Sequence, residues 1–167
     1  MIELKVKLTD GAPLPRHAKP GDAGLDLTAA ETVTLRPGET KMVGTGVSVE
    51  IPEGHVGLVF PRSGLGSRGV NLSNCVGVID SGYRGEIKAP LHNNHPPVLF
   101  NEQEWKRGYQ YYDDGCTVNR GKVMTVERGE RVCQLVVVPF ASCTCVEVEE
   151  LGDTDRGSGG FGSTGRC

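Results

Sequence analysis

The chain has 167 residues and a mass of 17.8 kDa, which is enough for one domain with a buried core. Its net charge of −3, with both signs mixed along the sequence, argues against binding of nucleic acid or of a membrane surface. No apolar run approaches the length of a membrane span and the chain opens on no secretory signal, so we expect a cytoplasmic protein.

Alternation of apolar and polar residues dominates the sequence, with Gly and Pro between the runs. The alternating runs lie at residues 2–8, 32–35, 47–51, 56–60 and 131–140. No apolar stripe of helical period has a convincing length, and only a turn or two of helix is expected from Ser63. This pattern predicts an all-β protein, a jelly-roll-like sandwich or barrel that forms a single domain over residues 1–167.

The segment from Asn74 to Lys88 predicts two short strands joined by a Gly-rich hairpin. The backbone N–H and C=O groups of such a turn can bind the polar edge of a flat ligand. Asp80 and Tyr83 flank the same place, where the carboxylate can orient a water and the ring can form a flat wall. A ligand pocket is one interpretation of this pattern, and a purely structural hairpin is the other.

Residues 92–122 interrupt the alternation and carry five of the nine aromatic residues of the chain. One interpretation is a long hairpin or sub-lobe that packs these rings against the barrel or against each other. The other is an exposed contact surface for a partner.

The six cysteines do not have the spacing of a disulfide framework. Cys75 and Cys133 lie in apolar, strand-like runs, where a thiol behaves as a small hydrophobe. The Cys143-Thr-Cys145 pair has strand spacing, but no second pair with zinc-site spacing follows it. Recruitment of His92 and His95 as further ligands leaves only a weak zinc pattern.

The C-terminal tail, residues 153–167, is rich in glycine. Its Gly157–Gly162 stretch satisfies G-x-G-x-x-G, but a dinucleotide site needs a long helix after this motif, and only five residues follow. A flexible terminus is the default interpretation. The alternative is a triphosphate-binding arm, for which the tail offers a guanidinium, an aromatic ring and two hydroxyls: Arg156, Phe161, Ser163 and Thr164.

Five motifs stand in a fixed order along the chain: Ala23–Leu27, Pro61–Gly66, Asn74–Lys88, Arg128–Leu135 and Arg156–Gly165. In this order they resemble the homotrimeric dUTPase family, the deoxyuridine 5′-triphosphate nucleotidohydrolases. The resemblance is interrupted by residues 92–122, an insertion similar to those in enzymes of some bacteriophages. Because such insertions are associated with regulatory proteins, the resemblance suggests a protein partner for this segment.

The resemblance implies a jelly-roll subunit, a homotrimer with active sites at subunit interfaces, and Mg²⁺-dependent hydrolysis of dUTP to dUMP and pyrophosphate. This reaction limits uracil incorporation into DNA and supplies dUMP for dTTP synthesis. Asp80 is implied as the base that activates the water attacking the α-phosphorus. Asp26 is implied to contact the water shell of the metal.

The resemblance also implies which residues bind the substrate. Uracil is implied to meet Asn74, Val78, Ile79 and Lys88, with Tyr83 packed under the deoxyribose. The phosphates are implied to meet Arg62, Ser63, Gly64 and Gln134. The tail is implied to cross to another subunit, where Phe161 stacks on uracil and the phosphates are held by Arg156, Gly162, Ser163 and Thr164.

Two other functions stay open. A dCTP deaminase-like or bifunctional enzyme of the same fold needs a glutamate and polar groups at C4 of cytosine, whereas Tyr83 and the complete tail favour the hydrolase. An interaction protein would use the barrel as a scaffold and the insert of residues 92–122 as a regulatory interface.

Overall fold

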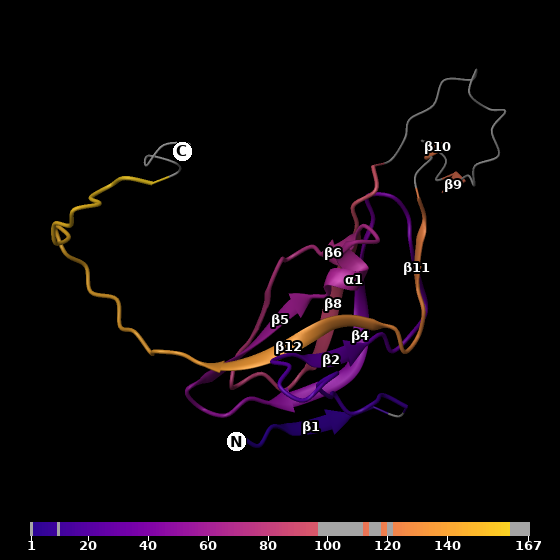
Figure 1. Cartoon of the computed structure of the whole chain (residues 1–167), viewed down its shortest axis with the longest axis horizontal. Helices are drawn as coiled ribbons and strands as arrows, with labels where there is room; N and C mark the ends of the chain where they lie inside the picture. Colours follow the sequence, from indigo (N-terminus) through magenta and orange to yellow (C-terminus); the bar gives the residue numbers. More distant parts are fainter. Residues whose placement is uncertain (1, 10, 97–111, 114–117, 120–121, 161–167) are drawn as a thin grey trace.

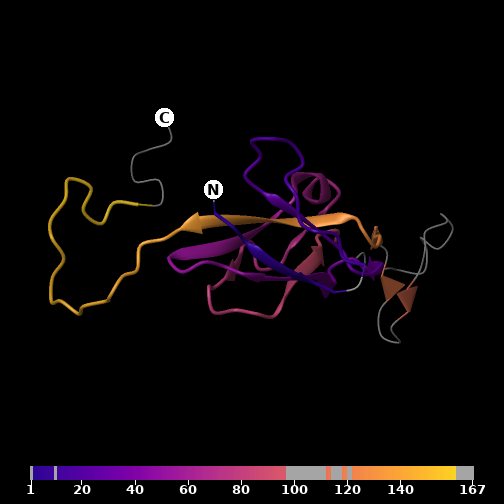
Figure 2. The same cartoon turned by 90° about the horizontal axis from the view of Figure 1, so that it is seen from below.

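The computed structural model describes residues 2–9, 11–96, 112–113, 118–119 and 122–160, and it confirms the all-β, jelly-roll class (Figure 1). The first antiparallel sheet has the strand order β1 (Lys5–Leu8), β4 (Thr40–Glu50), β8 (Glu86–Asn93), β6 (Val70–Leu72). The second has the order β2 (Leu25–Thr28), β12 (Arg131–Pro139), β5 (His55–Pro61), β7 (Gly77–Ile79). The sheets form two layers, seen edge-on in Figure 2.

The remaining elements are short. Two small ribbons pair β11 (Met124–Val126) with β3 (Val33–Leu35) and β10 (Val118–Asn119) with β9 (Tyr112–Asp113). The helix expected from Ser63 is α1 (Ser63–Gly66), which lies between β5 and β6. Within the described ranges, no helix has the length and apolarity needed to cross a bilayer.

The alternating runs predicted from the sequence form strands because their side chains alternate between core and solvent. In the run 47–51, for example, Val47, Val49 and Ile51 are buried while Ser48 and Glu50 are only half-buried. The same period is visible in β12, where Cys133 and Leu135 point into the core between the two sheets. Burial of one face of each sheet therefore fixes which residues face the core.

The prediction that the two strands between Asn74 and Lys88 pair with each other as a hairpin is wrong. The two strands exist as β7 and β8, but they belong to different sheets. Val78 of β7 pairs with Leu58 of β5, whereas Ala89 of β8 pairs with Val43 of β4. The physical reason is that each strand finds a longer partner, while the residues between them, 80–85, are more than a two-residue hairpin turn requires.

The expectation for the two strand-like cysteines holds for one of them. Cys133 is fully buried in β12. Cys75 is exposed and lies in a turn before β7, with a positive φ of 60°. Its N–H donates to the carbonyl of Leu72 over 3.1 Å, so local turn bonding replaces the expected strand position.

Asn93, at the end of β8, is a fully buried polar residue that ties together both flanks of the segment 92–122. Its amide nitrogen donates to the carbonyls of Leu35 at 3.0 Å and of Lys122 at 2.8 Å. Its side-chain oxygen accepts the N–H of His95 at 3.1 Å. Both ends of the segment are therefore fastened to the barrel by one amide.

We predict that Asn93→Leu lowers the free energy of unfolding by about 2–4 kcal/mol, because two carbonyls lose their buried donor. Urea unfolding at fixed protein concentration measures the change. The matched control is Asn94→Leu at the exposed neighbouring position, whose backbone bond to Gly69 does not need the side chain. Equal stability of the two variants would contradict the role given to Asn93.

Candidate active site

A cavity of about 300 Å³ opens where β7 and β8 separate. Six of its lining residues were predicted as site residues: Asn74, Val78, Ile79, Asp80, Tyr83 and Lys88. The sequence analysis missed Met42 of β4 and Glu86 of β8, which also line it. Met42 is 60% exposed, which the sequence did not reveal because no alternating run was predicted at this position.

The outer edge of β7 gives the cavity a row of backbone polar groups. In the described part of the chain, β7 is the last strand of its sheet and pairs with β5 alone. The N–H and C=O groups of an edge strand are unpaired on one side. This edge can therefore bind the polar rim of a flat base, as the sequence predicted for the turn.

Tyr83 is held in place by the turn that links the two strands. Its hydroxyl donates to the carbonyl of Glu86 at 3.0 Å, and its N–H donates to the carbonyl of Asp80 at 3.0 Å. The phenol lies so close to Gly85 that a Cβ there would overlap it. Gly85 is thus required by the position of the ring, whereas a Cβ at Gly82 would meet no atom within contact range.

Glu86 connects the cavity to a β-bulge in β4. The register between β4 and β8 shifts between Gly44 and Ser48, and the Glu86 carboxylate accepts the N–H of Gly46 at 2.7 Å. Gly46 has a positive φ of 69°, a conformation that favours glycine. The bulge therefore places a carboxylate at the cavity wall while satisfying a backbone donor.

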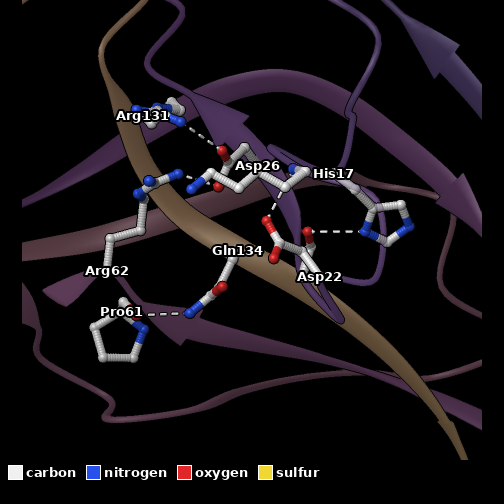
Figure 3. Close-up of polar contacts among 9 residues, drawn as sticks. His17, Asp22, Asp26, Pro61, Arg62, Arg131 and Gln134 are labelled. Atoms are coloured by element: carbon white, nitrogen blue, oxygen red, sulfur yellow. Dashed lines mark hydrogen bonds and ion pairs between the residues drawn. The ribbon is translucent and has the colours of Figure 1, made fainter. Parts of the chain in front are cut away.

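A second group of predicted residues surrounds Asp26 on β2 (Figure 3). One carboxylate oxygen of Asp26 accepts a hydrogen bond from Arg62, and the other accepts one from Arg131 at 3.0 Å. The side chain of Asp26 is only 15% exposed, whereas that of Arg131 is 53% exposed. The carboxylate therefore fixes two guanidinium groups, and the sequence analysis had not assigned the second of them, Arg131.

Gln134 of β12 points toward the end of β5, where its amide nitrogen lies 3.4 Å from the carbonyl of Pro61 (Figure 3). The amide rests on Gly24, and a Cβ at that position would overlap it. Gly24 lies in the first motif, but nothing in the local sequence reveals which side chain needs its missing Cβ.

The turn after β5 begins α1 without a side-chain cap. Arg62 is the N-cap residue in an extended conformation, with φ −98° and ψ 135°. Ser63 is the first helical residue, so its hydroxyl is not the cap that a helix start at this position would suggest. A Cβ added at Gly64 would meet nothing within contact range, which leaves open space beside this turn.

The predicted site residues form two groups that do not share a cavity within one copy of the chain. Among the described residues, the cavity lining includes neither Asp26, Arg62, Ser63 nor Gln134. The chain after β12 leaves the barrel as an extended arm (Figure 1). On this arm the Nε of Arg156 donates to the carbonyl of Gly159 at 2.9 Å. The other predicted tail residues lie outside the described residues: Phe161, Gly162, Ser163 and Thr164.

The two histidines considered as zinc ligands have other partners. His92 Nδ1 lies 2.8 Å from the hydroxyl of Thr40, and His95 Nε2 lies 3.1 Å from the carbonyl of Arg68. No cluster of three or more metal-ligating side chains occurs in the part of the chain that the structure describes.

Cys133 lies directly beside the second group of site residues. Burial raises the pKa of its thiol to about 12, while the Arg62 charge lowers the pKa and the Asp26 charge raises it to a smaller extent. The folded state therefore holds the proton at pH values where the unfolded chain has released it.

We predict that this thiol makes stability fall with rising pH between about 9 and 12. The folded-state pKa is raised, so the stabilisation is fully present below the unfolded-state pKa and is lost up to the folded-state value. Relative to Cys133→Ala, the wild type should lose up to about 1.4 kcal/mol of unfolding free energy per pH unit in this window. Parallel pH profiles of the two proteins would contradict the assignment.

Comparison with known proteins shows the family of the chain. The dUTPase family model matches residues 10–102 and 116–165, and its break falls inside the segment 92–122. A Thermobifida fusca protein named deoxyuridine 5′-triphosphate nucleotidohydrolase is 42% identical over 165 residues, which are 98% of this chain and 78% of the relative.

Two solved phage structures resemble the fold. The Staphylococcus bacteriophage 80alpha dUTPase with dUPNHPP superposes with a TM-score of 0.81 at 33% identity, covering 99% of this chain and all of that one. A mutant dUTPase from phage phi11 of S. aureus, which coordinates a structural Mg(II) ion, gives 0.69 at 32% identity over 89% and 98% of the two chains. The chain belongs to the dUTPase family.

Proposed function

We propose that the protein hydrolyses dUTP to dUMP and pyrophosphate in the cytoplasm. The observation that carries this proposal is the cavity between β7 and β8, which combines a free strand edge, the Tyr83 ring and the Asp80 carboxylate. The curated relatives are named as nucleotidohydrolases, which favours hydrolysis over deamination of dCTP. A flat base bound to the β7 edge would present its sugar to Tyr83.

Asp80 is proposed to act as the general base. Its carboxylate accepts a proton from water while the water oxygen forms a bond to the α-phosphorus. The bond between that phosphorus and the oxygen bridging to the β-phosphorus breaks, and pyrophosphate leaves with the electron pair. Asp80 is exposed at the rim of the cavity, where a water can reach it.

Arg62, Ser63, Gly64 and Gln134 are proposed to bind the phosphates. Charge develops on phosphoryl oxygens during the reaction, so donors fixed in advance lower the barrier. The Asp26 carboxylate fixes the Arg62 guanidinium before substrate arrives. The first N–H groups of α1, those of Ser63 and Gly64, have no acceptor within the helix and are available to a phosphate.

The donor set suits Mg²⁺ held chiefly by the substrate. Mg²⁺ keeps several waters and binds through phosphates and one or two carboxylates, so a cage of protein ligands is not needed. Both oxygens of Asp26 already accept hydrogen bonds from arginines. Each oxygen keeps a second lone pair, which could accept a hydrogen bond from a metal-bound water. The bound ion would neutralise part of the charge on the triphosphate.

A complete site is proposed to need several copies of the chain, arranged as a homotrimer. One copy keeps the cavity apart from the Asp26 group. The arm after β12 extends away from the barrel (Figure 1) and exposes apolar side chains: Phe140, Val146, Val148 and Leu151. Val146 is 76% and Leu151 is 87% exposed, so in a single copy more than half of the apolar surface of these side chains stays open to solvent. A neighbouring copy is the surface that would cover it and receive the tail.

We predict that Asp80→Ala lowers turnover of dUTP by about 10²–10⁴-fold, the usual contribution of a positioned base. Pyrophosphate release measures turnover, and binding of a non-hydrolysable dUTP analogue should persist. Glu53→Ala, at an exposed acid in the turn before β5, is the matched control and should keep full activity. Near-normal turnover of Asp80→Ala would show that another group is the base.

We predict that removal of residues 153–167 lowers turnover by about 10²-fold or more, because the phosphates lose donors that enclose them. The barrel should keep its thermal midpoint, since the described residues of this segment pack on no part of the core. An unchanged rate after truncation would reduce the tail to an ordinary chain terminus.

A further inference from the structure

We infer that His95, together with Arg68, is a positioning residue for the phosphate-binding turn Arg62–Gly64. His95 lies in the segment 92–122, outside all five motifs, and holds the far end of the short helical run that begins at Arg62. The inference rests on the proposed phosphate role of this turn, and it adds a residue from outside the five motifs to the reaction.

His95 packs directly against the loop after α1 and can form a hydrogen bond to it. His95 Nε2 lies 3.1 Å from the carbonyl of Arg68, so a proton on this nitrogen makes the ring a donor. Gly69 has a positive φ of 89°, and a Cβ on it would lie 2.6 Å from His95 Nε2. The N–H of Asn94 donates to the carbonyl of Gly69 at 2.8 Å. The His95 ring therefore occupies the space beside Gly69 that a Cβ would fill. The His95 side chain and the Asn94 backbone both hydrogen-bond to this loop.

Arg68 fastens the same loop to the strand region that follows the insert. Its guanidinium donates to the Glu130 carboxylate and, at 3.2 Å, to the carbonyl of Thr125 in β11. Glu130 immediately precedes Arg131, which binds Asp26 at 3.0 Å. The loop is thus held between the start of the segment 92–122 and the strand that carries Gln134.

The run between the two ends is one hydrogen-bonded unit. Gly66 N–H donates to Arg62 C=O at 2.9 Å, Ser67 N–H to Ser63 C=O at 2.8 Å, and Arg68 N–H to Leu65 C=O at 3.0 Å. A helix this short is marginal without tertiary contacts. Arg62 is fixed at one end by Asp26, and the carbonyl of Arg68 is fixed at the other by His95. Loss of either contact leaves the intervening N–H groups free to change direction.

The expected effect of losing His95 concerns phosphate binding and not base binding. Neither His95 nor Arg68 is among the described residues that line the β7–β8 cavity. A loosened turn should therefore weaken a ligand with three phosphates more than a ligand with one. A change that merely lowered overall stability would weaken both ligands by the same factor.

The test measures the dissociation constants of a non-hydrolysable dUTP analogue and of dUMP, by calorimetry on the same preparation of the full chain. The quantity compared is the dissociation constant of the analogue divided by that of dUMP. Because both constants come from one sample, this ratio does not depend on the folded fraction. His95→Leu should weaken the analogue about fivefold, the effect of one lost hydrogen bond, with less than a twofold change for dUMP. His95→Gln should restore the wild-type ratio, because its amide nitrogen can donate from nearly the same place.

Two further variants complete the design. His92→Leu is the matched control: it removes the contact of another histidine, at the end of β8, with Thr40 and should leave the ratio unchanged. Arg62→Gln removes the guanidinium assigned to the phosphates and should raise the ratio of the analogue's dissociation constant to that of dUMP. If Arg62→Gln raises this ratio and His95→Leu does not, or if His95→Gln behaves as His95→Leu, the positioning role is overturned. If Arg62→Gln has no effect, the phosphate assignment of the turn fails.

Discussion

The separation of β7 from β8 is the constraint on which the rest of this structure depends. Each strand completes a different sheet, β7 through Val78 and Leu58, and β8 through Ala89 and Val43. The turn between them must therefore bridge the two layers, and a cavity opens beneath it. Among the described strands, β7 pairs on one side only, so the backbone groups of its other edge could bind the polar edge of a base. Ordinary sheet pairing in the core thus creates the proposed functional surface.

The core sheet also positions a group of charged side chains, on the other side of β5 from β7. The Asp26 carboxylate holds two guanidinium groups that would otherwise repel each other and move freely. Fixing them before substrate arrives reduces the reorganisation that a developing phosphoryl charge would demand. The cavity and this charged group lie in different places on one copy, and the arm extends away from the barrel. A site assembled from several copies accounts for all three observations.

The sequence predicted elements well where one local period decided them. Strands such as β4 and β12 followed from the alternating runs at residues 47–51 and 131–140, and the short helix at Ser63 was placed correctly. Strand partners were not predictable, because the pairing of Val78 with Leu58 depends on which residues meet across the core. The same limit applies to Gly85, whose missing Cβ matters only because the Tyr83 ring lies over it. Arg131 was missed because its ion pair joins residues 105 positions apart.

The most direct test of the shared site is co-expression of the Asp80→Ala chain with the chain lacking residues 153–167. Each variant alone lacks one part of every site. If the tail serves a neighbouring copy, random assembly of a symmetric oligomer should restore about a quarter of the sites. The predicted result is a turnover near that fraction of wild type. Activity no higher than that of the two variants measured separately would show that each tail serves its own copy, and it would contradict the account.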